Sequence, residues 1–238
     1  MATASPEAIA RHPHLGDPQR AGRVRVDLHT HTMWSGDSTT TPDEFAVAVE
    51  ASGLDVVCIT DHNAIDGAVE LRDRLACRVI VGEELRTAAG EIIGLFLTER
   101  VPMWISHLDA AKAIRDHGGV VYIPHPFDPM RRNMNESALY ELAEADLIDA
   151  VEVLNAKTSL ASLNRRAAEF GAEFGIVGGA GSDGHVPHAL GAAYVEMADF
   201  DTPMEFLGSL ATADVVGHHW DEPRPWSPRI VPSIMPGV

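Results

Sequence analysis

The sequence predicts an α/β fold in which a mostly parallel sheet, open or closed into a barrel, is flanked by helices. Short apolar segments alternate with helix-like segments from residue 24 onward, and this alternation is typical of β-α-β units. The length of 238 residues suits one large domain, and single α/β barrels are commonly about this long. Polar residues that can bind metals follow several of the apolar segments, as expected where sites form at strand ends.

Each element is indicated by its own pattern. Eight segments have the apolar, β-branched character of strands: 24–29, 55–60, 78–84, 92–97, 119–124, 150–154, 176–181 and 192–197. Five segments have helical spacing and good helix formers: 42–52, 64–76, 104–117, 136–146 and 157–173. Thr41 and Pro42, followed by two acids, predict a helix start, and Gly53, Gly118 and Gly171 are expected at helix ends.

The two ends of the chain differ in composition from the segment between them. We expect a loose leader over residues 1–22, one domain over 23–220, and a Pro-rich tail packed on that domain over 221–238. No apolar run approaches the ~20 residues of a membrane span, so a membrane is not an expected partner. Cys58 and Cys77 lie in or beside apolar segments and are interpreted as reduced packing residues, which favours a cytoplasmic protein.

The net charge of −17 argues against binding to duplex DNA or RNA, which requires a basic surface. An anionic substrate would therefore need a local source of positive potential, and divalent cations are the obvious source. The sequence does not determine the oligomeric state.

Histidines and acids recur at the ends of the predicted strands. His29 and His31, two apart in VDLHTHT, would point to the same side if the strand continues. Further ligand-type residues follow four later strands: Asp61 and His62, Glu83 and Glu84, His125, and Asp183 and His185. The carboxyl ends of parallel strands open onto one face, so the pattern predicts a site for several metal ions there.

The motifs DLHTHT (27–32), TDHN (60–63), GEE (82–84), PHPF (124–127) and SDGH (182–185) resemble, in order, those of the PHP (polymerase and histidinol phosphatase) superfamily. The resemblance spans roughly residues 24–200. It implies a distorted (β/α)7 barrel and a centre of two or three metals that hydrolyses phosphate esters.

The resemblance also implies a ligand set. His29, His31 and Asp183 would hold a first metal, with Glu83 bridging to a second metal that His125 also binds. A third metal would be held by three more residues: His62, His185 and Asp37. Many relatives carry this acid directly after the serine of the loop, whereas Asp37 lies one residue later. Many also have a histidine where this chain has Glu91, and a carboxylate can bind a divalent cation as well.

The expected chemistry follows from these ligands. The mixed N and O donors suit Zn, Mn or Fe. No side-chain nucleophile is identified; a hydroxide bridging two cations is the expected nucleophile. Arg131, Arg132 and Lys157 are candidates for binding the phosphate.

The favoured hypothesis is hydrolysis of a small phosphorylated metabolite or nucleotide. Candidates are a nucleoside 3′,5′-bisphosphate, an oligonucleotide end and histidinol phosphate. Two alternatives remain open at this point: a metal-dependent hydrolase of a non-phosphate bond, and a non-catalytic metal-binding structural or regulatory module.

Overall fold

A computed structural model describes residues 22–218. Its strands are β1 (Arg23–Thr30), β2 (Val56–Ile59), β3 (Arg78–Thr87), β4 (Gly90–Leu95), β5 (Val120–Ile123), β6 (Ala150–Asn155), β7 (Val177–Gly181), β8 (Ala193–Ala198) and β9 (Asp214–Gly217). Its α-helices are α2 (Pro42–Ser52), α3 (Asp66–Arg72), α4 (His107–Asp116), α5 (Glu136–Glu144), α6 (Ala161–Phe174) and α7 (Pro203–Leu210). Two short 3-10 helices, η2 (Met33–Ser35) and η3 (Pro187–Ala189), complete the elements.

The strands form one curved sheet in the order β7-β6-β5-β4-β3-β2-β1-β8-β9. The sheet closes on itself because the chain after β7, which lies at one end of the sheet, pairs with the end of β1. Thr30 and Gly184 form a parallel bridge, and the Asp183 amide donates to the His29 carbonyl at 2.8 Å. The α/β barrel fold expected from the sequence is confirmed, and the barrel closes at the carboxyl end of β1.

The sheet is less parallel than we expected. β1, β2 and β3 pair in parallel, as do β5, β6 and β7, but β4 is antiparallel to both of its neighbours, and β8 is antiparallel to β1 and β9. The tight connection between β3 and β4, with Gly90 at φ +133°, leaves no room for a crossover helix. The start of β4 therefore lies at the same end of the barrel as the finish of β3.

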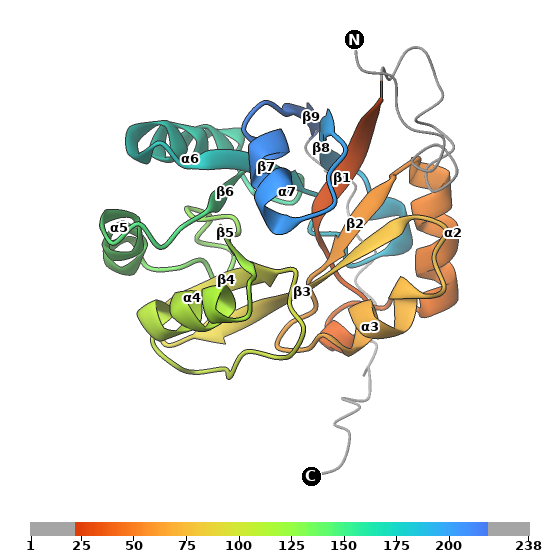
Figure 1. Ribbon diagram of the computed structural model, residues 1–238, viewed down its shortest axis with the longest axis horizontal. Coiled ribbons are helices and arrows are strands. Elements are labelled where there is room, and N and C mark those ends of the chain that lie inside the picture. Colours follow the sequence, from red (N-terminus) through yellow and green to blue (C-terminus); the bar gives the residue numbers. More distant parts are fainter. Residues whose placement is uncertain (1–21, 219–238) are drawn as a thin grey trace.

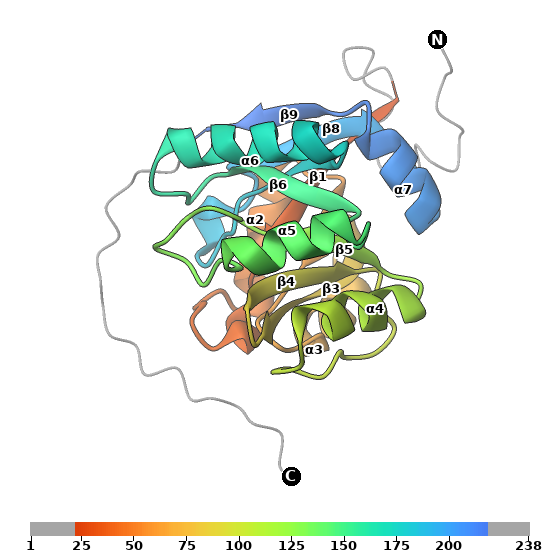
Figure 2. The same cartoon turned by 90° about the vertical axis from the view of Figure 1, so that its left-hand side faces the viewer.

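Helices cover the outside of the sheet (Figure 1), and Figure 2 shows α4, α5 and α6 along one side of it. The helix start at Thr41 is confirmed as a capping box, in which the Thr41 hydroxyl accepts from the Glu44 amide and the Glu44 side chain accepts in return. The expected helix end at Gly171 is wrong. The helix continues to Gly175, which takes the positive φ of +68°, whereas Gly171 allows α6 to pack closely on Val151 of β6.

Two apolar clusters form the core. One lies between the helices and the sheet and includes Phe45, Ile114 and Phe170. The other includes Leu28, Ile93 and Tyr122, and it extends to Phe206 of α7. Burial of both faces of the central strands accounts for their nearly continuous apolar runs.

α7 and β9 are not among the elements predicted from the sequence. The signal for α7 was present, because Thr202 and Glu205 form a second capping box with the same Thr-Pro-x-Glu spacing as residues 41–44. The leader expected over residues 1–22 lies outside the described residues except for Gly22, and the tail expected over 221–238 lies wholly outside them. Among residues 22–218, no helix has both the length and the apolar character needed to cross a membrane.

Candidate metal centre

The carboxylate of Glu84, on β3, lies at the centre of a buried histidine cluster. Its oxygens are 3.3 Å from Nε2 of His29, 3.3 Å from Nε2 of His31, 3.1 Å from Nδ1 of His62 and 3.1 Å from Nε2 of His125. Two of these histidines come from the carboxyl end of β1, one follows β2 and one lies in the loop after β5. The fold thus brings together histidines that the sequence places at the ends of separate strands.

The expectation that Glu83 bridges two metals is corrected by this geometry. The Glu83 side chain accepts from the Val101 amide at 2.9 Å and faces Arg100 at 3.8 Å, away from the cluster. Successive side chains of a strand point to opposite faces, so only one of two adjacent glutamates can reach the histidines. In this chain Glu84 does so.

Asp183 lies beside His29 and His31 in the cluster. Its Oδ1 is 3.5 Å from Nε2 of His31 and 3.9 Å from Nε2 of His29. On its other side, the Lys157 ammonium donates to the same oxygen at 3.1 Å. Burial raises the pKa of the Asp183 carboxyl, but Lys157 and His29 outweigh it and hold the pKa well below its usual range.

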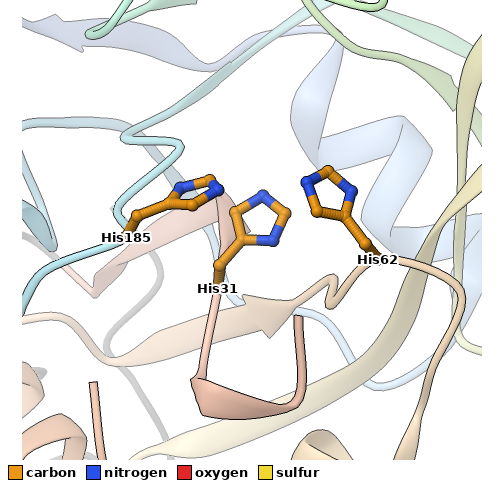
Figure 3. A group of neighbouring side chains, drawn as sticks. All are labelled: His31, His62 and His185. Carbon is orange, nitrogen blue, oxygen red and sulfur yellow. The ribbon is translucent and has the colours of Figure 1, made fainter. Parts of the chain in front are cut away.

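Asp37 is brought to the outer part of the cluster despite its one-residue offset. Its two oxygens are 3.3 Å from Nε2 of His62 and 3.4 Å from Nε2 of His185. Figure 3 shows the rings of His31, His62 and His185 facing one another, and the His31 and His185 ring centroids are 4.1 Å apart. The three residues proposed for a third metal are therefore adjacent.

Glu91 also reaches the cluster. Its Oε1 lies 3.8 Å from Nδ1 of His62 and 3.5 Å from Nε of Arg86. Its position follows from the antiparallel direction of β4, whose start lies beside the carboxyl ends of the parallel strands. Burial and the nearby Glu84 carboxylate raise the pKa of Glu91 to about 7.

The histidines of the cluster experience opposite electrostatic environments. Burial and the neighbouring His185 lower the pKa of His31 to about 4, which favours the neutral imidazole that a metal ligand requires. Burial also disfavours the charged form of His62, but Glu84 and Asp37 outweigh it and raise the pKa to about 10. The negative charge of Glu84 and Asp37 that stabilises a proton on His62 would also stabilise a metal cation bound there in place of that proton.

The donor atoms fit divalent transition metals. Four overlapping groups have one donor atom per residue, all within 4.8 Å of one another: His31, His62 and His185; His29, His31 and Glu84; His29, His125 and Asp183; and His62, Glu84 and Glu91. In the described structure, the buried atoms Nδ1 of His62 and Oε1 of Glu91 form no hydrogen bond, although Glu84 lies 3.1 Å from the first and Arg86 3.5 Å from the second. Such buried polar atoms are rare, and a cation would satisfy them.

Buried residues behind the cluster hold the ligands in place. Glu152, for which the sequence analysis fixed no role, accepts from Nδ1 of His29 at 3.1 Å, from the His125 amide at 2.7 Å and from Asn155 at 2.9 Å. Its position as the one charged residue of the mostly apolar strand β6 was the available signal.

Two aspartates organise the loop around His29 and His31. Asp61 accepts from the Ser35 hydroxyl at 2.7 Å, and that hydroxyl lies 2.8 Å from Nδ1 of His31. Asp27 accepts instead from backbone amides, including that of Ser182 at 2.9 Å, and so ties β1 to the chain after β7. Burial raises the pKa of Asp27 to about 6.

A cavity of about 190 Å³ opens onto the cluster. Its lining combines cluster residues with three arginines, Arg86, Arg131 and Arg132, and with Met130. Arg131 lies 3.8 Å from Asp183 and donates to the Lys157 carbonyl at 3.2 Å. Lys157 itself is buried, with Nζ 2.8 Å from Nδ1 of His185. The structure thus places Arg131 and Arg132 at the cavity and Lys157 behind it, against Asp183 and His185.

The barrel and the cluster together define a class of protein, an α/β barrel with a histidine- and carboxylate-lined cavity at the carboxyl ends of its strands. Residues 161–215 match the family model described as PHP-associated. An uncharacterized protein of Methanocaldococcus jannaschii is 31% identical over a 199-residue match that covers 79% of this chain and 79% of that protein. A second uncharacterized protein of that organism is 36% identical over 146 residues, covering 56% of this chain and 82% of that protein.

The fold is also similar to that of a two-domain protein from Bacteroides vulgatus containing a predicted PHP-like metal-dependent phosphoesterase. The TM-score is 0.65 at 18% identity, and the match covers 82% of this chain and 65% of the other, so this chain spans less than two-thirds of that protein. The chain therefore belongs to the same family as the first of these Methanocaldococcus jannaschii proteins, and its fold is that of PHP-like proteins.

Proposed function

We propose that this protein is a metal-dependent phosphoesterase that hydrolyses a small phosphorylated metabolite or nucleotide. The observation that carries the proposal is the convergence of histidine nitrogens and carboxylates on Glu84, beneath a cavity lined by three arginines. Two to three divalent ions of Zn, Mn or Fe suit this donor set. Such ions would supply an activated water and offset charge on the phosphoryl oxygens.

A formal charge count supports an anionic substrate. Three divalent ions would bring a charge of about +6, and the four carboxylates of Asp37, Glu84, Glu91 and Asp183 would remove about 4. The remainder of about +2 suits a phosphate monoester dianion. The arginines of the cavity add to this positive potential, and guanidinium groups bind phosphate oxygens through paired hydrogen bonds.

The cavity and the net charge favour small substrates. A volume of about 190 Å³ accepts a phosphoryl group with part of its ester, but not a duplex. The chain carries a net charge of −17, and its long-range field opposes a polyanion. Nucleoside 3′,5′-bisphosphates, oligonucleotide ends and histidinol phosphate remain the substrate classes to compare.

The test is release of phosphate from a substrate panel, before and after chelation and after readdition of Mn, Zn or Fe. The panel contains a nucleoside 3′,5′-bisphosphate, a sugar monophosphate, histidinol phosphate, a long oligonucleotide and an amide substrate. Metal-dependent turnover of a small phosphate ester supports the proposal. Turnover of the amide alone would indicate a hydrolase of another bond, and metal binding without turnover of any substrate would indicate a non-catalytic module.

A further inference from the structure

A second cavity, distinct from the metal centre, lies between α2 and η3. Its volume is about 710 Å³, and we call it the α2 groove. Its lining residues are Asp43, Glu44, Val47, Ala48, Ala51, Ser52, Pro187, His188 and Leu190. Small alanines leave the groove open, and the Val47 side chain on α2 is 68% exposed. An exposed apolar surface of this kind usually has a partner.

The chain itself leads from the sheet to this groove. β9 pairs antiparallel with β8 so that Gly217 faces Ala193, and the His218 amide donates to the Ala192 carbonyl at 3.0 Å. Ala192 is two residues from Leu190, which lines the groove. The described part of the chain therefore finishes next to the α2 groove, with twenty residues of sequence still to follow.

The other end of the described chain lies elsewhere. β1 begins at Arg23, which pairs with Ala198 at the far end of β8 from Ala193. Measured along β8, Arg23 is therefore farther from Leu190 than His218 is, because the His218 amide bonds the Ala192 carbonyl.

The composition of residues 223–238 suits an apolar groove with an acidic rim. This stretch contains Trp226 and five further large apolar residues: Ile230, Val231, Ile234, Met235 and Val238. Its only charged residues are Arg224 and Arg229, whereas α2 carries three acids and no basic residue. The two arginines would be attracted to the acids of α2.

Proline content and reach also favour this segment. Residues 223–238 contain five prolines, which disfavour a helix and favour extended polyproline-type backbone that loses little entropy on binding. Trp226 is eight positions after His218 in the chain, and eight steps of ~3.1 Å span ~25 Å. That reach is ample, because the segment starts beside the groove.

We propose that residues 223–238 of the same chain dock in the α2 groove, with Trp226 as the apolar anchor. Such docking would cover Val47 and place the two arginines near the acids of α2. The groove walls belong to elements that flank the metal centre, because α2 follows the loop of Asp37 and η3 follows His185.

Limited proteolysis of the full chain tests the docking without reference to activity. Trypsin cleaves after Arg229 but not after Arg224, which precedes a proline. Val47→Glu places a charge in the groove, whereas Val69→Glu places one on α3 at a residue that is 43% exposed and does not line the groove. We expect the cut after Arg229, read by mass spectrometry, to be about tenfold faster in Val47→Glu than in Val69→Glu or the parent. Equal rates in all three proteins would overturn the proposal.

Disulfide trapping identifies the occupant. In a Cys77→Ser background, Val47→Cys is combined with Ser227→Cys, and the control combines Val69→Cys with Ser227→Cys. Mild oxidation should close a bond within one chain for the first pair and much more slowly for the second, because bonding requires Cα atoms within about 7 Å. Equal rates for the two pairs, or a bond predominantly between two chains, would overturn docking of the segment on its own domain.

Discussion

Glu152 and His29 form a buried pair in which Oε1 of Glu152 lies 3.1 Å from Nδ1 of His29. Both side chains are fully buried. This contact places the proton of His29 on Nδ1 and leaves Nε2 to face the cluster, where a metal would bind. The other oxygen of Glu152 accepts from the His125 amide at 2.7 Å, so one carboxylate positions two predicted ligands from different strands.

Glu152→Gln should weaken metal binding while the protein stays folded. A glutamine side chain has only one oxygen that can accept a hydrogen bond. It therefore loses either the contact to His29 or the contact to the backbone N–H of His125. Loss of such a supporting group typically costs about 10–100-fold in metal affinity. Competition against a chelator measures the affinity, and Glu144→Gln, an exposed acid on α5, is the control. Equal affinities for the two variants would contradict the positioning role.

Glu83 and Glu84 are neighbours in β3, so the same substitution at each position provides a variant and its control. Glu84→Gln should lose one or more equivalents of bound metal, because its carboxylate faces four histidines. Glu83→Gln should retain the parent's content, because Glu83 faces Val101 and Arg100. Metal analysis after gel filtration measures both. Metal loss from the Glu83 variant alone would restore the assignment first expected from the sequence.

Asp37→Asn should reduce occupancy of one metal and spare the others. Asp37 contacts only the outer histidines His62 and His185 among the ligands, and its side chain is 54% exposed. The change removes one negative charge, so Asp43→Asn on α2 controls for charge alone. Calorimetric titration of the metal-free protein with the metal ion distinguishes the sites by their affinities. Unchanged stoichiometry and affinity at every site would remove Asp37 from the metal centre.

Arg132→Ala should impair substrate use without removing metal. Arg132 lines the cavity, and an arginine at that position would bind phosphate rather than cations. A charge-assisted hydrogen bond contributes about 1.5–3 kcal/mol, which corresponds to a loss of about 10–150-fold in kcat/KM. Steady-state kinetics on the best substrate of the panel measures this, with the exposed Arg165→Ala on α6 as control. Arg131 is a poorer test, because it also contacts Asp183 and the Lys157 carbonyl.

Gly181→Ala should destabilise the barrel. A Cβ at Gly181 would lie 2.3 Å from Cβ of His29 and 2.7 Å from Oε1 of Glu152, so β1 and β7 would have to separate. Overpacking of this kind costs about 1–3 kcal/mol. Gly208→Ala in α7 meets no atom within 4 Å and should be neutral or stabilising by up to about 1 kcal/mol. Urea unfolding compares the two, and similar stabilities would show that β7 can move away from His29.

The sequence by itself determined which residue types gather at the strand ends. Alternation of strand-like and helix-like segments predicted the α/β class, and the polar residues after these segments predicted a metal site. The resemblance of the motifs from DLHTHT to SDGH to those of the PHP superfamily implied the barrel and most residues of the cluster. These features are local, because they depend on spacing within one strand or one turn.

Only the tertiary structure decided the remaining points. The choice of Glu84 over Glu83 depends on which face of β3 meets the histidines, and the sequence pattern GEE is the same for either register. Glu91 joins the cluster because β4 runs antiparallel, and Asp37 because its loop folds back between His62 and His185. The role of Glu152 depends on contacts with His29 and the His125 amide, residues 123 and 27 positions away in the chain. Such long-range contacts follow from how strands pack around a closed barrel, and no local pattern specifies that packing.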